Sequence, residues 1–363
     1  MLLKTGKSSL SYELLLISFF IIIITGINGF IALAMLLGLS ELKFGRDPSN
    51  KHGVSSGNSR LGGLAITLSV ILGVMINLHL VSNLDVKNLS KELDSVPLLS
   101  LIIGLIGLAE DFRQGFSSII RLILMFVVVT TGLYFIPALI PYELKLFQYT
   151  GASDSIIIMY FFTSFMVCGF INAGNIADGA NGLLASIFFS FFLIAYDIDK
   201  TIFNLSILTT LVTFILFNVT TGRIFLGDFG AYGLSALVAF KSLEIYSIND
   251  ISVFFIASNL VYPCFEITRS LIMRSLNSSP LFSADNHHLH NHINDYLLKN
   301  GFKENFSNSL TGLGLAFFNS VLPLSLYFSG MPMQSQLWKV IFILQIIILI
   351  IIYIFFTKNL KVR

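Results

Sequence analysis

Four acidic side chains stand at the edges of long apolar runs in this sequence: Glu110, Asp111, Asp178 and Asp228. Ionisable groups that persist beside such runs generally face a bundle interior or a watery cavity. Clustered carboxylates repel one another unless a cation neutralises their charge. Mg²⁺ suits such a cluster, because it takes few carboxylates and completes its shell with waters and phosphate oxygens. The pattern predicts a site for Mg²⁺, or for Mn²⁺ in its place, where a diphosphate is attacked.

Basic side chains near these segments supply positive charge for further phosphate oxygens. Arg60 lies in "SRLGGLAI", and His288 and His290 lie in "SADNHHLHNH", which holds four histidines within six residues. Each pattern has a simpler interpretation. Arg60 is compatible with an exposed residue in a turn before a helix, and the histidines with zinc binding or a solvated loop. A single carboxylate near a helix end is often a solvated cap or an arginine partner.

The composition shows which elements must position these groups. Of the 363 residues, 55% are hydrophobic and only 12% are charged, and the mean hydropathy is +0.83. These values lie outside the range of a soluble domain. Runs such as "VIFILQIIILIIIYIFF" are long enough to cross about 30 Å of hydrocarbon as helices. The sequence therefore predicts an all-α integral membrane protein.

Hydropathy predicts a polytopic bundle of about 11 transmembrane helices, near 12-38, 61-83, 96-109, 117-140, 154-171, 182-196, 203-220, 229-247, 251-273, 307-329 and 337-357. Alternate threading places every arginine on or beside one side, which the positive-inside rule makes the cytoplasmic side. The N-terminus is then outside, although Lys4 and Lys7 oppose this, because Lys43, Arg46, Lys51 and Arg60 outweigh them. The C-terminus is cytoplasmic, and so are all four carboxylates.

No internal repeat or linker divides the sequence, so we expect one transmembrane domain over 1-363, and its largest loop, 275-306, holds the histidines. Cys168 and Cys264 lie in apolar segments without metal-like spacing, which gives no support for a disulfide or zinc site. The net charge of +2 is too small to indicate nucleic-acid binding. The bilayer is the partner that the composition predicts.

Five motifs in order resemble those of a known family. They are "SRLGGLAI", "GLAEDFR", "NAGNIADGANGL", "IFLGDFGAYG" and "DNHHLH", and they fall on one predicted face between about residues 40 and 295. The chain resembles the polyprenyl-phosphate N-acetylhexosamine-1-phosphate transferases, of the glycosyltransferase 4 type. This family includes the UDP-GlcNAc:undecaprenyl-phosphate GlcNAc-1-phosphate transferases that initiate O-antigen and, more distantly, phospho-MurNAc-pentapeptide translocase of peptidoglycan synthesis.

The resemblance implies an enzyme in the bacterial inner membrane with its active site on the cytoplasmic face. The reaction would move a sugar 1-phosphate from a UDP-sugar to undecaprenyl phosphate, release UMP and require Mg²⁺, and a homodimer is compatible with the family. Glu110, Asp111 and Asp178 would be catalytic, the first two at the lipid phosphate, and Asp228 would bind the metal. The expected substrate contacts are Arg60, Gly62, Gly63, Asn172, Asn175, Asn181, His288 and His290.

Asn172, Asn175 and Asn181 offer amide donors and acceptors to a nucleotide or sugar without adding negative charge to an anionic site. The sequence departs from the family pattern in three places. Glu110 replaces an aspartate common at that position, Asn181 replaces the second aspartate of the extended motif, and Leu289 interrupts the histidines. The last two features resemble an envelope-polysaccharide branch more than the peptidoglycan translocase.

Three other functions stay open at this stage. The peptidoglycan translocase would carry a consecutive histidine triad, which Leu289 breaks. A membrane transporter would place ionisable groups near the bilayer midplane on broken helices, often with an internal repeat. An inactive homologue that scaffolds an assembly would not need Asp111, Asp178 and Asp228, although Glu110 keeps that interpretation open.

Overall fold

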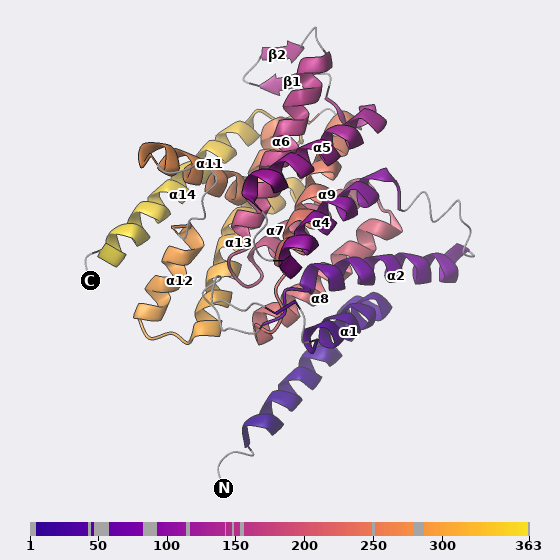
Figure 1. Cartoon of the computed structure of the whole chain (residues 1–363), viewed down its shortest axis with the longest axis vertical. Helices are drawn as coiled ribbons and strands as arrows, with labels where there is room; N and C mark the ends of the chain where they lie inside the picture. The colour runs from indigo at the N-terminus through magenta and orange to yellow at the C-terminus, as the bar shows by residue number, and fades with distance from the viewer. Residues whose placement is uncertain are drawn as a thin grey trace.

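The computed structural model describes residues 5–42, 45–46, 58–82, 93–113, 117–141, 143–146, 149–152, 156–248, 251–278 and 287–361. Lys4, Lys43 and Lys51 lie outside these residues, as do Asp285 and Asn286 of the last motif. Helices dominate the described residues (Figure 1): α1 Thr5–Ser40, α2 Gly62–Ser82, α4 Ser95–Arg113, α5 Ser118–Phe135, η1 Pro137–Leu139, α6 Ile156–Ala177, α7 Leu183–Ile198, α8 Ile202–Thr221, α9 Gly227–Ile248, α10 Val253–Asn259, α11 Val261–Leu276, α12 Leu289–Lys299, α13 Glu304–Phe328 and α14 Leu337–Lys361.

Eight helices within the described residues are long and apolar enough to cross a membrane: those in α1, α2, α4, α5, α6, α8, α13 and α14. Helix α7 is apolar but shorter. Helix α9 has 22 residues and begins with several glycines and an aspartate, so it fails the same test of apolarity. The prediction of a multi-pass helical membrane protein is confirmed, whereas eleven spans and their orientation stay predictions.

The predicted span 251-273 is two helices in the structure, α10 and α11, which are separated at Leu260. Pro263 is the physical reason, because a proline has no N–H to donate and its ring clashes with the carbonyl four residues earlier. That carbonyl belongs to Asn259 and accepts from Asn319 Nδ2 at 2.8 Å. Asn319 Oδ1 in turn accepts the backbone N–H of Tyr262 at 2.9 Å. An amide of α13 thus satisfies both sides of the break.

Helix α13 also contains a proline, and a side-chain amide again donates to the carbonyl that the proline leaves without a partner. Pro323 lies inside it and leaves the Asn319 carbonyl without its helical donor. Gln345 Nε2 of α14 donates to that carbonyl at 3.2 Å and to the Ser258 carbonyl at 3.3 Å. Backbone groups in an apolar interior must find partners within the protein. These buried amides therefore fasten α10, α11, α13 and α14 to one another.

Helix α9 lies at the centre of the bundle, against α2, α4 and α6. Glycines allow this close approach: a Cβ on Gly63 would lie 2.1 Å from Gly230 Cα, and one on Gly107 would lie 2.2 Å from the Asp228 carbonyl oxygen. Any side chain at these positions would separate the helices. The glycines therefore set the position of the start of α9, where Asp228 lies.

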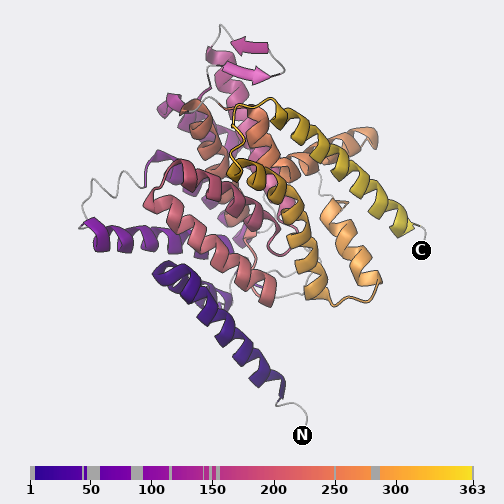
Figure 2. The same ribbon diagram turned by 180° about the vertical axis from the view of Figure 1, so that it is seen from behind.

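Two features stand apart from the bundle in both views (Figures 1 and 2). The first half of α1 projects away from the other helices, and Gly26 interrupts this helix with φ 60° and ψ −142°. A small antiparallel hairpin, β1 Glu143–Leu146 and β2 Tyr149–Ala152, pairs Glu143 with Ala152 at the opposite end of the molecule. The all-α expectation misses this hairpin, which lies in a segment predicted as a loop.

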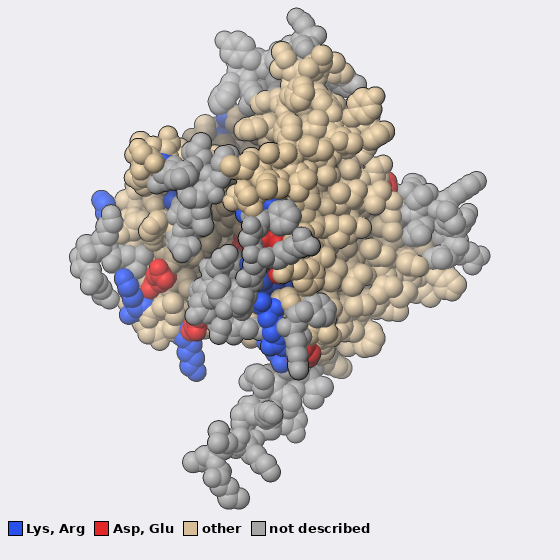
Figure 3. All heavy atoms as spheres, in the orientation of Figure 1, with Lys and Arg blue, Asp and Glu red and all other residues tan. Residues whose placement is uncertain are grey.

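The surface is divided by charge. In the view of Figure 3, uncharged residues cover most of the upper right of the molecule, whereas acidic and basic side chains gather at the centre and lower left. Many large apolar side chains are exposed on the long helices, among them Phe161, Phe165 and Ile351. Contiguous apolar surface of this kind is typical of protein in contact with lipid.

Candidate active site

A cleft at the start of α9 brings together five of the twelve predicted site residues. Its volume is about 560 Å³, open mouth included. The polar side chains that line it are Arg60, Asn175, Asp178, Asn181, Asn218, Asp228 and Asn308. They come from the segment before α2, the end of α6, the loop before α7, and α8, α9 and α13. Residues distant in the sequence thus form one polar hollow in an apolar bundle.

Asp111 lies directly behind this cleft and is buried. Its Oδ1 accepts the backbone N–H of Asp228 at 3.2 Å, and its Oδ2 accepts that of Phe229 at 3.0 Å. Arg60 Nη1 lies 3.3 Å from Oδ1. The first N–H groups of a helix have no helical acceptor and attract negative charge. Asp111 therefore caps α9 and fixes both Arg60 and the backbone of Asp228.

Glu110 has a different environment from its neighbour. It forms an ion pair with Arg121 of α5, and Arg121 Nη1 also donates to Tyr232 Oη at 2.9 Å. Asn175 Nδ2 donates to the same hydroxyl at 3.2 Å. Tyr232 therefore links the Glu110–Arg121 pair to a cleft residue. The two members of the acidic pair face different cations, Arg121 and Arg60.

The donors of the cleft fit Mg²⁺ that is shared with a substrate. Asp178 and Asp228 both line it, and so do Asn181 and Asn218, whose Oδ1 atoms are buried and accept no hydrogen bond from the described residues. Among those residues, no group of three or more His, Cys, Asp or Glu side chains is arranged to hold a metal ion. Mg²⁺ needs only one or two carboxylates when waters and phosphate oxygens complete its shell.

Three predicted substrate contacts have other partners in the structure. Asn172 Nδ2 donates to the Cys168 carbonyl of its own helix at 2.8 Å. The Gly62 and Gly63 N–H groups donate to the carbonyls of Phe225 and Leu226 at 2.8 and 2.9 Å. The glycines therefore hold the start of α2 against the segment before α9. None of the three lines the cleft, and their contact with substrate stays a prediction.

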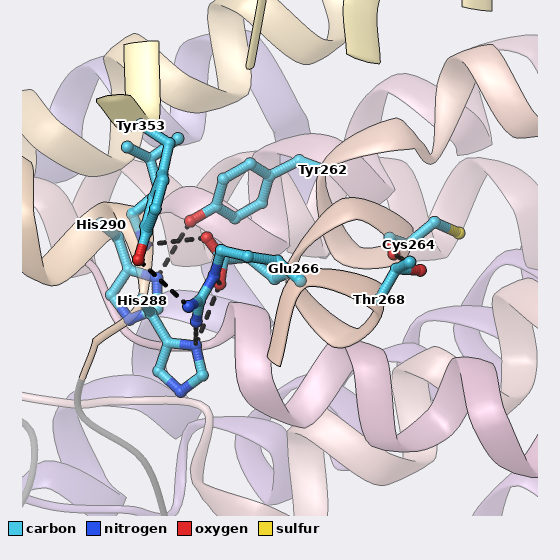
Figure 4. Close-up of polar contacts among 9 residues, drawn as sticks. Tyr262, Cys264, Glu266, Thr268, His288, His290 and Tyr353 are labelled. Carbon is cyan, nitrogen blue, oxygen red and sulfur yellow. Dashed lines mark hydrogen bonds and ion pairs between the residues drawn. The ribbon is translucent and has the colours of Figure 1, made fainter. Parts of the chain in front are cut away.

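The two predicted histidines lie beside the cleft and are buried. Figure 4 shows them with the side chains of α11 that hold them. His288 Nδ1 lies 3.0 Å from Glu266 Oε2, and His290 Nδ1 lies 3.0 Å from Tyr262 Oη. A Cβ on Gly179 would lie 1.9 Å from His290 Nε2. His290 therefore reaches the loop that carries Asp178.

The sequence reasoning overlooked several residues of this region. Glu266 is an ionisable group inside the predicted span 251-273, and the rule that such groups have a task should have identified it. Tyr232 follows Asp228 by four residues, so helical spacing places both on one face of α9. Asn218, Asn308 and Tyr353 carry no local signal, because only the tertiary fold brings them to the site.

The charges in the cleft perturb Asp178, which follows the last residue of α6. Its removal from water raises the pKa well above the ordinary value of 3.8, and the negative charge of Asp228 raises it further. Arg60 lowers this pKa, and Asp111 raises it. A carboxyl whose pKa is raised in the folded protein stabilises the fold only while it is protonated. The folded state therefore loses stability as the pH rises from 3.8 through the higher pKa of Asp178.

The raised pKa of Asp178 predicts how Asp178→Asn changes the stability of the folded protein. We expect the variant to melt at a higher temperature than the wild type at neutral pH when EDTA removes divalent cations. The difference should shrink as the pH is lowered towards 4, because the wild-type carboxyl then becomes protonated. Thermal melts of detergent-solubilised protein across this pH range measure it. Parallel curves for the two proteins would contradict the prediction.

Comparison with known proteins shows the family of this region. Residues 94–246 match the model of glycosyl transferase family 4. The chain thus carries a glycosyl transferase family 4 region. The resemblance predicted from the ordered motifs is confirmed, and the family 4 region contains Glu110, Asp111, Asp178 and Asp228. Arg60 and the histidines lie outside it.

The similarity to individual proteins covers more of the chain than the family 4 region does. A phospho-N-acetylmuramoyl-pentapeptide-transferase of Wolbachia pipientis wMel is 26% identical over 205 residues, which cover 51% of this chain and 59% of that protein. A probable undecaprenyl-phosphate N-acetylglucosaminyl 1-phosphate transferase of Bacillus subtilis is 25% identical over 258 residues, 68% of each chain. A protein of Streptococcus thermophilus (strain CNRZ 1066) with the same name as the Wolbachia relative is 28% identical over 211 residues, 54% of this chain and 61% of that protein.

Proposed function

We propose that the protein transfers an N-acetylhexosamine 1-phosphate from a UDP-sugar to undecaprenyl phosphate, giving undecaprenyl-diphospho-sugar and UMP. The observation that carries this proposal is the cleft in which Asp178, Asp228 and Arg60 meet beside buried histidines, in a helical bundle with an apolar surface. One substrate is a lipid and the other a charged nucleotide, so the reaction needs such a polar site at a membrane boundary.

In this proposal an oxygen of the lipid phosphate attacks the β-phosphorus of the UDP-sugar. The new P–O bond forms as the bond from the β-phosphorus to the bridging oxygen breaks, and that oxygen leaves with UMP. When bound, Mg²⁺ would neutralise the diphosphate and stabilise the leaving UMP phosphate. Asp228 would hold the ion, together with Asp178 and substrate oxygens. His288 and His290 would bind diphosphate oxygens from the other side of the cleft.

The acidic pair supports a single displacement over a route through an acyl phosphate. Both oxygens of Asp111 already accept backbone N–H groups, and Arg60 lies against one of them. A nucleophilic carboxylate would have to leave these partners. Glu110 and Arg121 form an ion pair that a lipid phosphate can join through the guanidinium. We therefore assign orientation of the lipid phosphate to the pair, with proton removal by Glu110.

The relatives and the histidine segment support the choice of an N-acetylhexosamine donor in this proposal. The names of the relatives indicate a GlcNAc 1-phosphate donor or a phospho-MurNAc-pentapeptide donor. Leu289 between the histidines and Asn181 in the second motif favour the former. We infer that the product initiates a cell-envelope polysaccharide such as O-antigen, on the cytoplasmic side of a bacterial inner membrane. The alternative product is the lipid intermediate of peptidoglycan synthesis.

The deciding experiment is an assay of UMP release by purified, detergent-solubilised protein. The reactions contain undecaprenyl phosphate, Mg²⁺ and one of UDP-GlcNAc, UDP-GalNAc or UDP-MurNAc-pentapeptide, with no-lipid and EDTA controls. We expect UMP from an N-acetylhexosamine donor only when lipid and metal are both present. Release from the pentapeptide donor alone would replace the proposal with its alternative. No release from folded protein with any donor would overturn both.

A further inference from the structure

Glu266 makes contacts that no proposed step of the reaction uses. Its side chain is fully buried, and it comes from α11, outside the cleft and outside the family 4 region. Its Oε1 accepts the backbone N–H of Leu289 at 2.8 Å, and its Oε2 lies 3.0 Å from His288 Nδ1. One carboxylate thus holds both the ring of His288 and the backbone at the start of α12.

The surrounding side chains complete this arrangement. Arg269 Nε donates to Glu266 Oε2 at 3.2 Å, and the guanidinium carbon lies 5.1 Å from the centre of the Tyr353 ring. Tyr353 also has its ring edge-on to His292, 5.5 Å away. Tyr262 holds the second histidine through the bond to His290 Nδ1. Figure 4 shows Tyr262, Glu266 and Tyr353 converging on His288 and His290. Side chains of α11 therefore contact both rings directly, and Tyr353 of α14 packs against Arg269 and His292.

The orientation of the rings follows from these bonds. The rings of His288 and His290 stack at a distance of 5.3 Å with 15° between their planes. The Nδ1 atoms of the two rings lie against Glu266 and Tyr262, so each Nε2 atom lies on the side of its ring that faces away from these two residues. His290 Nε2 points at Gly179, and in Figure 4 the second ring nitrogen of His288 points away from Glu266. Arg269 Nη2 also lies 3.1 Å from His288 Nδ1, and buried partners on Nδ1 fix the direction of an imidazole ring.

We propose that Glu266 is a positioning residue for the donor site. Together with Tyr262, Arg269 and Tyr353, which we call the histidine clamp, it holds His288 and His290 with Nε2 directed towards the diphosphate of the UDP-sugar. This inference rests on the proposed function and adds that α11 and α14 determine binding of the donor but not of the lipid.

The first test is Glu266→Gln, which removes the charge and keeps the shape. We expect KM for the UDP-sugar to rise about tenfold or more, as for removal of partners that orient ligand histidines, with KM for undecaprenyl phosphate unchanged. Glu244→Gln is the matched control, because Glu244 pairs with Lys241 near the far end of α9 and should leave both constants unchanged. An equal rise in both KM values for Glu266→Gln would indicate a merely structural role and overturn the inference.

The second test asks whether Glu266 acts through His288. We expect Glu266→Gln to have no further effect on donor KM in a His288→Ala background, because residues that act as a unit are not additive. Full additivity would overturn the inference. If Glu266→Gln does not fold, Glu266→Asp takes its place, since it keeps the charge but shortens the reach by one methylene.

The third test needs no activity and separates failure of the clamp from failure of the proposed function. Hydrogen exchange of the peptide that contains Leu289, followed by mass spectrometry, should become faster in the folded Glu266 variant. The amide then donates to a neutral acceptor in place of a carboxylate. Peptides of α9 should exchange as in the wild type. Unchanged exchange at Leu289 would overturn the clamp even if wild-type protein released UMP.

Discussion

We expect Asp228→Asn to lower the rate of UMP release in the proposed reaction by roughly a hundredfold or more, while the variant stays folded. The reason is that Asp228 lines the cleft at the start of α9, and in the proposed reaction its carboxylate would hold Mg²⁺. An amide has nearly the same shape but lacks the charge, and loss of one electrostatic contact to a developing oxyanion typically costs about 10²–10³ in rate. The steady-state rate of UMP release at saturating substrates measures this effect.

The fold gives a reason to expect the variant to remain stable. The contacts that fix the start of α9 use the backbone N–H groups of Asp228 and Phe229, which the substitution keeps. Removing one negative charge also relieves repulsion with Asp178. Asp197→Asn is the matched control, because Asp197 forms a largely exposed pair with Lys200 beyond the apolar part of α7. Full activity of folded Asp228→Asn protein would remove this residue from the metal site.

Comparison of the wild type with Asp228→Asn also tests binding of Mg²⁺ in an experiment that needs no enzymatic activity. Mg²⁺ that binds only the folded protein raises its melting temperature in proportion to the logarithm of its concentration above the dissociation constant. We expect Mg²⁺ to raise the melting temperature of the wild type and to have little effect on Asp228→Asn in the presence of UMP. Equal responses in the two proteins would place the ion elsewhere.

Apolar runs and charge patterns predicted the class of fold and several of its helices, because the length of a membrane-spanning helix is set by the bilayer. The break between α10 and α11 could have been predicted only in part. Pro263 indicates a disturbance, but its repair depends on Asn319 and Gln345, which lie far along the sequence. The hairpin of β1 and β2 was missed because each strand has only four residues. The alternation of polar and apolar residues in Glu143–Leu146 is too short to indicate a strand, and Tyr149–Ala152 has none.

The candidate site, too, could be predicted only in part from the sequence. Asp178, Asp228 and Arg60 were identified from residue types beside apolar runs, and the fold brings all three to one cleft. The separate environments of Glu110 and Asp111 could not be predicted from adjacent positions. Successive residues on a helix point about 100° apart, so one faces Arg121 and the other Arg60. No role was predicted for Gly179, because only the fold shows that it lies against the ring of His290 in α12.

We expect Gly179→Ala to lower kcat/KM for the UDP-sugar by about tenfold or more. A methyl group at this position would lie 1.9 Å from His290 Nε2 and 2.5 Å from His290 Cδ2, so the ring must move. His290 is buried and bonded to Tyr262, and a ring held in this way cannot rotate aside without losing that bond. Misplacement of a binding group by about 1 Å can cost about 10²-fold in rate. Steady-state kinetics with varied UDP-sugar and fixed lipid measure the change.

Gly169→Ala is the matched control, because Gly169 lies in the same segment of the sequence within α6 and a methyl group there meets nothing within 4 Å. It should leave kcat/KM unchanged and stabilise the helix slightly, since alanine is the better helix former. A combined Gly179→Ala, His290→Ala protein should be no worse than His290→Ala alone, because the clash disappears with the imidazole. If Gly179→Ala also lowered kcat/KM of the His290→Ala protein, its effect would arise from the loop that carries Asp178. This outcome would contradict the prediction that Gly179 is needed to leave room for the His290 ring.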